Sequence, residues 1–70
     1  MRMKPLLARS DLRPGMLVQN VVSKTIGEVL GGRGGRLRQA RWDFVCVAYR
    51  DAAGRRRINT WYLWNVRIAR

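Results

Sequence analysis

The side chains that could carry catalysis are few and scattered through the sequence. The 70 residues include no histidine, one cysteine and four acids, which are Asp11, Glu28, Asp43 and Asp51. General acid–base catalysis needs a histidine or paired carboxylates with shifted pKa values, whereas these acids fall in two predicted turns and two separate predicted strands. Asp51 is expected to bond its own backbone in a turn. We therefore expect no enzymatic activity.

Cys46 lacks the partners that a reactive or metal-binding thiol needs. It lies between Val45 and Val47, where a thiol usually packs as a small hydrophobic group. A single cysteine forms no internal disulfide, and neither a histidine nor a second cysteine is present to complete a zinc site of the usual kind. We expect neither a metal nor a cofactor, and no small-molecule substrate.

Cationic side chains dominate the chemistry that this sequence offers. Lysine and arginine number 15 against the four acids, which gives a formal net charge of +11. So high a charge attracts polyanions, which in a cell are chiefly DNA, RNA and anionic membrane surfaces. A codon bias toward arginine explains arginine over lysine but not the shortage of acids. Nucleic acid is the expected partner, with DNA and RNA both open.

No apolar stretch indicates a membrane protein. The longest apolar run, Phe44 to Tyr49, is far shorter than the roughly twenty residues of a membrane span. The apolar residues that follow the basic start of the chain end at Arg9, which leaves them too few for a signal peptide. We expect a soluble, cytoplasmic protein that does not contact a membrane.

The first group of candidate binding residues lies in a glycine-rich segment, Gly31 to Arg41. Four glycines in five residues predict a flexible loop without a stable element. No Gly-Lys-Ser/Thr follows, so the segment does not have the pattern of a nucleotide-binding loop. Phosphate contacts are expected from its arginines, which are Arg33, Arg36, Arg38 and Arg41.

The second group lies on a predicted hairpin whose strands are Trp42 to Tyr49 and Arg56 to Trp61. Two registers are open, and a slip of one residue exchanges the faces. A three-residue loop with a left-handed Gly54 pairs Tyr49 with Arg57 and Val45 with Trp61. A four-residue loop would instead bury Val45, Val47, Tyr49, Ile58 and Thr60. We prefer the first register because Asp43 then shares the outward parity of Val45.

On the preferred register, one hairpin face combines cations with rings that can stack on bases. The expected binding residues of this face are Tyr49, Arg55, Arg56, Arg57 and Trp61. The opposite face is then the expected core, formed by Phe44, Cys46, Ala48, Ile58, Thr60 and Tyr62. The three tryptophans, Trp42, Trp61 and Trp64, are each open to a core or a surface role.

Short strands account for the rest of the sequence. Met16 to Val18 and Ile26 to Leu30 read as the first two strands, and Gly27 within the second indicates a bulge or a close backbone approach. A tight helical turn at Tyr62 to Asn65 precedes a closing strand at Val66 to Ala69. The expected fold is all-β, with a flexible N-terminal arm at residues 1–10 and a single domain at residues 11–70.

The order of these features resembles Src-homology-3-like small barrels of the KOW and Tudor kind. The residues that carry the resemblance are Leu12-x-Pro14-Gly15-x-x-Val18, Gly27-Glu28-Val29, Val45-x-Val47-x-Tyr49-x-Asp51-x-x-Gly54, Ile58 and Leu63. The resemblance implies a five-stranded barrel that binds nucleic acid, RNA polymerase, the ribosome or a peptide. Tyr49 falls where Tudor domains have a cage aromatic, but no companion rings match.

Two further functions compete with an accessory or regulatory nucleic-acid-binding module. Exposed Val45, Val47 and Trp61 would instead form an apolar patch for a protein partner or a second copy of the chain. An oligomeric enzyme with its site at a subunit interface is the more distant alternative. Salt separates the first two, because only polyanion binding weakens steeply as salt rises.

Overall fold

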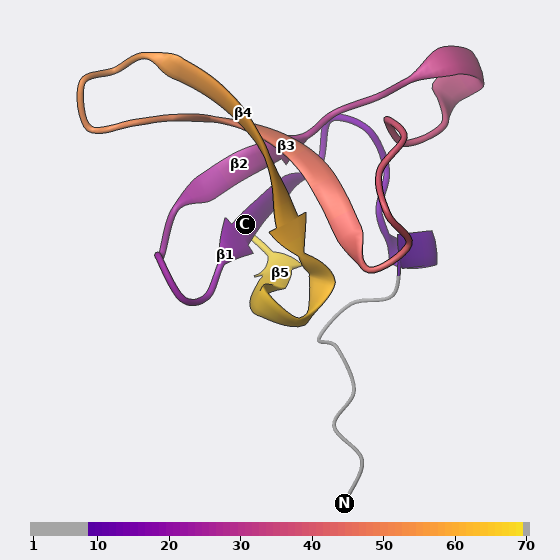
Figure 1. The fold of residues 1–70 in the computed structure, drawn as a ribbon, viewed down its shortest axis with the longest axis horizontal. Coiled ribbons are helices and arrows are strands. Elements are labelled where there is room, and N and C mark those ends of the chain that lie inside the picture. The colour runs from indigo at the N-terminus through magenta and orange to yellow at the C-terminus, as the bar shows by residue number, and fades with distance from the viewer. Residues whose placement is uncertain (1–8, 70) are drawn as a thin grey trace, which may run out of the picture.

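Five antiparallel strands form a single sheet in the computed structural model, which describes residues 9–69. The strands are β1 (Leu17–Asn20), β2 (Ile26–Val29), β3 (Phe44–Arg50), β4 (Arg56–Tyr62) and β5 (Val66–Ile68). Their order across the sheet is β4-β3-β2-β1-β5 (Figure 1). The all-β prediction is confirmed. The sheet is not closed, because β4 and β5 are its two edges.

Helical structure within residues 9–69 is limited to three short 3-10 turns. They are η1 (Arg9–Asp11), η2 (Arg33–Gly35) and η3 (Leu63–Asn65). The turn expected at Tyr62 to Asn65 is therefore present as η3. Residues 1–8 of the predicted arm lie outside the described residues, while Arg9 and Ser10 belong to η1.

One face of the sheet, here called the inner face, covers a small apolar core. Alternation places one set of side chains from each strand on this side. The buried cluster consists of Leu12, Val18, Val29, Val45, Val47, Trp61, Leu63 and Val66. Leu12 reaches it from the segment before β1, where Gly15 turns the chain at a φ of 89°. The opposite side of the sheet is the outer face.

Gly27 gives the core room for its largest side chain. A Cβ atom at this position would lie 2.9 Å from Cη2 of Trp61 and 3.1 Å from the carbonyl oxygen of Ala48. The close backbone approach expected at this glycine is thus confirmed. The absence of a side chain at this position of β2 leaves room for the indole of Trp61 from β4.

The register of the β3–β4 hairpin is the preferred one. Tyr49 pairs with Arg57, and Val45 pairs with Trp61. Gly54 has a φ of 79°, as the three-residue loop requires.

The predicted faces of this hairpin are wrong, although the register is right. Val45, Val47 and Trp61 are 1%, 0% and 7% exposed and lie in the core, whereas Ile58 and Tyr62 point outward and are 49% and 40% exposed. Trp61 therefore cannot form part of an exposed binding face. Both alternating sets of side chains on β3 are apolar, so alternation alone does not determine which set is buried. The packing of the whole core determines it.

The glycine-rich segment is also more ordered than its composition predicts. Gly31 and Leu37 form an antiparallel bridge, and the amide of Arg38 donates to the carbonyl of Leu30 at 3.0 Å. Leu37 packs against the core, and η2 lies at the tip of the loop. The prediction of a segment without a stable element is wrong, because long-range bonds and one leucine anchor it.

The free edge of β4 has a defined hydrogen-bonding parity. The amide of Asp51 donates to the carbonyl of Arg55, and the amide of Leu63 donates to that of Asp43, both at 2.9 Å. Because bonded pairs alternate along an antiparallel ladder, the odd-numbered residues of β4 bond to β3. The even-numbered residues turn their backbone groups to the open edge, where the Asn59 side chain accepts the Thr60 amide at 2.8 Å.

Candidate nucleic-acid interface

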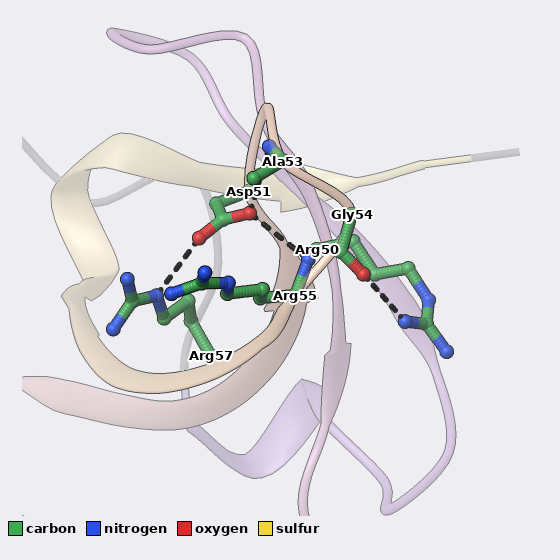
Figure 2. Close-up of polar contacts among 6 residues, drawn as sticks. All are labelled: Arg50, Asp51, Ala53, Gly54, Arg55 and Arg57. Carbon is green, nitrogen blue, oxygen red and sulfur yellow. Dashed lines mark hydrogen bonds and ion pairs between the residues drawn. The ribbon is translucent and has the colours of Figure 1, made fainter.

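Asp51 organises the hairpin turn at which three of the predicted binding arginines lie. Its Oδ1 accepts the amides of Ala53 and Arg55 at 2.9 and 3.0 Å. Its Oδ2 accepts Nε of Arg57 at 2.9 Å (Figure 2). Asp51 is therefore a turn-forming residue, as its position in the sequence predicts.

The ion pair with Arg57 changes the titration of both groups. The hydrogen bond from the Arg57 side chain, followed by the backbone bond from Arg55, lowers the pKa of the Asp51 carboxyl below its ordinary value of 3.8. The same bond raises the pKa of Arg57. Arg57 thus keeps its charge but has part of its field cancelled by Asp51.

The predicted hairpin face is divided between the two sides of the sheet. Arg57 shares the parity of Tyr49, whose ring lies 5.6 Å from that of Trp61 beside the core. Arg56 pairs with Arg50 on the outer face. Arg50 also donates to the carbonyl of Gly54 at 2.8 Å (Figure 2). The sheet therefore does not bring Tyr49, Arg57 and Arg56 onto one surface.

Two of the loop arginines line an open groove with arginines of the η1 region. The cavity has a volume of about 980 Å³ and its lining includes Arg9, Arg13, Arg33 and Arg36 together with Leu12. We call it the arginine groove. No acid is among the described residues that line it. Figure 1 shows the η2 loop and the hairpin turn projecting toward opposite sides of the molecule, so their cations serve different surfaces.

Arg9 holds the wall of the arginine groove in place. Its guanidinium donates to the carbonyls of Arg38 and Arg41 at 3.4 Å, and also to that of Phe44. The side chain of Arg13 likewise donates to the carbonyls of Ser10 and Leu12, at 2.9 and 3.0 Å. Bonds to neutral carbonyls leave both guanidinium groups charged, so the groove remains cationic. Nothing in the local sequence around Arg9 predicts this role.

An aromatic cluster that the sequence reasoning missed lies on the outer face. Phe44 and Tyr62 are cross-strand partners with ring centroids 5.3 Å apart. Trp64, from η3, stacks beside Tyr62 at 6.4 Å. Cζ of Arg41 lies 5.9 Å from the centroid of Phe44, and Nε of Arg41 lies 3.8 Å from Asp43. The signal was present, since the correct register with the opposite face exposes these rings.

Other apolar side chains extend the outer face beyond the aromatic cluster. Leu17, Ile26 and Ile58 are exposed by 52%, 52% and 49%. Glu28 is the acid of this face and lies opposite both Leu17 and Ala48. Trp42 is 79% exposed, but it makes no ring contact within residues 9–69.

Within the part of the chain that the structure describes, histidine, cysteine and acidic residues form no group of three or more that could hold a metal ion. In the same residues, no helix has the length and apolar character needed to cross a membrane.

Comparison of the chain with protein-family models, curated proteins and solved structures gives no match.

Proposed function

We propose that the protein is a nucleic-acid-binding module that acts as an accessory or regulatory factor. The observation that carries the proposal is the arginine groove, where Arg9, Arg13, Arg33 and Arg36 surround one cavity without an acid among its described lining residues. Guanidinium groups bind phosphates through paired N–H donors. Bonds from Arg9 and Arg13 to backbone carbonyls hold two of the four in place before a ligand arrives.

The overall charge supports the same function. A net charge of +11 speeds the approach of a polyanion and supplies affinity that is independent of sequence. Of the four acids, Asp51 is bonded to Arg57 and Asp43 lies beside Arg41, so part of the small negative charge is already neutralised. Arg38, Arg41 and Arg55 remain candidates for additional phosphate contacts.

Salt-dependent binding tests this proposal. Affinity for a DNA or RNA oligonucleotide is expected to fall steeply between about 50 and 200 mM salt. The double variant Arg33→Ala with Arg36→Ala is expected to weaken binding and to flatten the salt slope by about 0.9 per lost duplex phosphate contact. The matched control, Lys24→Gln with Arg67→Gln, removes the same charge away from the groove. Absence of binding at low salt would contradict nucleic-acid binding, and equal effects of both variants would contradict the assignment of the binding site to the groove.

A protein-interaction module is the second candidate, and the apolar outer face favours it. Exposed Leu17, Ile26, Ile58 and Tyr62 lie on one side of the sheet, which makes a larger apolar surface than isolated residues do. In this case, binding or self-association would depend on Leu17 and Tyr62 alike and would hardly respond to salt. Mass in solution, measured at low and high salt, separates this candidate from the first.

The resemblance to Src-homology-3-like barrels of the KOW and Tudor kind is retained as part of the proposal. Its support is the five-stranded antiparallel order together with a short 3-10 turn before the last strand. The sheet is open between β4 and β5, so barrel closure does not support the resemblance. Such small β folds bind their ligands on loops and exposed strand faces, which agrees with the locations of the groove and of the aromatic cluster.

A further inference from the structure

We infer that the outer face of the β3–β4 hairpin is a stacking platform for the unpaired bases of single-stranded nucleic acid. This inference rests on the proposed function and adds the class of ligand. The platform consists of the aromatic cluster Phe44, Tyr62 and Trp64, with Arg41 at the same end and Arg50 and Arg56 at the other.

The rings are placed where a base can reach them. Val45, Trp61 and Leu63 enter the core, so alternation turns Phe44 and Tyr62 to the opposite side. Tyr62 is 40% exposed although its ring contacts two others. The cluster therefore presents ring surface to solvent instead of completing the core.

The side chains of β3 between the two ends are small. Along β3, the outward positions after Phe44 are Cys46 and Ala48, which are only 7% and 8% exposed, so their cross-strand partners Thr60 and Ile58 form the accessible surface there. The distance from Phe44 to Arg50 is about 20 Å at a strand rise of about 3.3 Å per residue. The hairpin between the aromatic cluster and the arginine pair is therefore long enough for a chain of several nucleotides.

The charges on the platform match a strand whose phosphates flank its bases. The Arg41 side chain is 80% exposed beside the Phe44 ring, and Arg50 and Arg56 are cross-strand partners at the far end. Among the described residues, Glu28 on β2 is the acid of the outer face; it lies opposite Ala48 and lines a small pocket with Arg50 and Arg56. Asp43 lies 3.8 Å from Arg41. A nucleic acid strand supplies both complementary groups, a base face for each ring and a phosphate for each cation.

Duplex nucleic acid fits this surface poorly. Its bases already stack and pair inside the helix, so a ring can reach a base face only at an end, a bulge or an unpaired segment. Aromatic platforms of this kind bind single strands and tolerate any sequence, because every base has a π face. The structure therefore favours a single-stranded ligand without strong sequence preference.

The experiment compares two probes with the same phosphates. The protein is titrated with a single-stranded oligothymidylate and with an abasic oligonucleotide of equal length, both at low salt. Stacking contributes about 1–3 kcal/mol per base, or about 5- to 150-fold in Kd. The parent protein is therefore expected to bind the thymidylate at least about fivefold more tightly. Equal affinities would overturn the inference.

Variants then assign the effect to the cluster. Tyr62→Ala is expected to weaken thymidylate binding by about fivefold or more and to leave abasic binding and the salt slope unchanged. Tyr62→Phe keeps the ring, and Leu17→Ala removes an apolar side chain from another part of the outer face, so both should behave as the parent. Equal weakening of both probes by Tyr62→Ala would overturn the assignment.

The outcomes distinguish the inference from the function on which it rests. If both probes bind with strong salt dependence but equal affinity, the protein binds nucleic acid and the inference of base stacking is wrong. If neither probe nor a duplex binds, the proposed function itself fails. If Tyr62→Ala does not fold, as thermal unfolding would show, the comparison of the two probes on the parent protein still decides.

Discussion

At the residue scale, the contact between Gly27 and Trp61 determines how the sheet covers its core. The sequence predicts a close approach at this glycine but not its partner, because the predicted parity of the hairpin places Trp61 on the exposed face, whereas Trp61 lies in the core. The missing information is the strand order, in which β2 and β4 both flank β3, and no local pattern contains it. A hydrogen atom at position 27 leaves the space that the indole occupies.

The first prediction concerns the substitution Gly27→Ala. The added methyl group would lie 2.9 Å from the Trp61 ring and 3.1 Å from a backbone oxygen, so it forces the packing to shift. We expect a loss of about 1–3 kcal/mol in the free energy of unfolding, measured with denaturant.

A double-mutant cycle with Trp61→Leu provides the control, because the smaller side chain relieves the clash. Gly27→Ala should then cost clearly less in the Trp61→Leu background than in the parent. Equal costs in the two backgrounds would show that the ring is not the cause.

At the scale of the elements, the turn and the register of the β3–β4 hairpin are the most predictable part of the fold. The choice of its buried face is the main prediction that the structure contradicts. The positions of Asp51 and Gly54 allowed the loop and the register to be predicted from local turn chemistry. The choice of face could not follow from them, because Phe44, Cys46 and Ala48 are as apolar as Val45, Val47 and Tyr49. For the same reason, Trp61 was expected on the exposed face but is buried, and Tyr62 was expected in the core but is exposed.

The second prediction uses the turn carboxylate. The pKa of Asp51 is lowered below 3.8 in the folded protein, so its stabilising contribution is complete above the unfolded-state pKa and disappears as the pH falls through the folded-state pKa. The melting temperature of the parent should therefore fall on acidification below about pH 4. In Asp51→Asn, which keeps an acceptor for the turn amides but no charge, this part of the fall should be missing. Identical pH profiles would contradict the assignment.

At the scale of the whole molecule, unbalanced charge is the dominant feature. The net charge of the whole chain is +11, and the extents of the structure are 40 × 30 × 22 Å. Charges interact across about 30 Å at 0.01 M salt but across only about 10 Å at 0.1 M. At low salt, each arginine is therefore repelled by nearly all the others.

The third prediction is that salt stabilises the folded protein. Raising sodium chloride from about 10 to about 100 mM should raise the melting temperature by a few degrees, since about 1 kcal/mol corresponds to about 4–8 °C for a domain of this size. The charge-reduced Lys24→Gln, Arg67→Gln variant should show a smaller rise. A melting temperature that stays constant or falls with salt would mean that self-repulsion is unimportant here.

The open edge of β4 has a consequence for colloidal behaviour. Its even-numbered residues offer unpaired backbone groups to a neighbouring strand, beside the exposed side chains of Ile58 and Tyr62, and such edges promote association. Arg56 and Arg57 and the Asn59 side chain protect this edge, the arginines by repulsion and Asn59 by bonding the Thr60 amide. A bound polyanion cancels the repulsion. Solutions should therefore stay clear when either component is in excess, and they should become turbid where the charges of protein and polyanion balance.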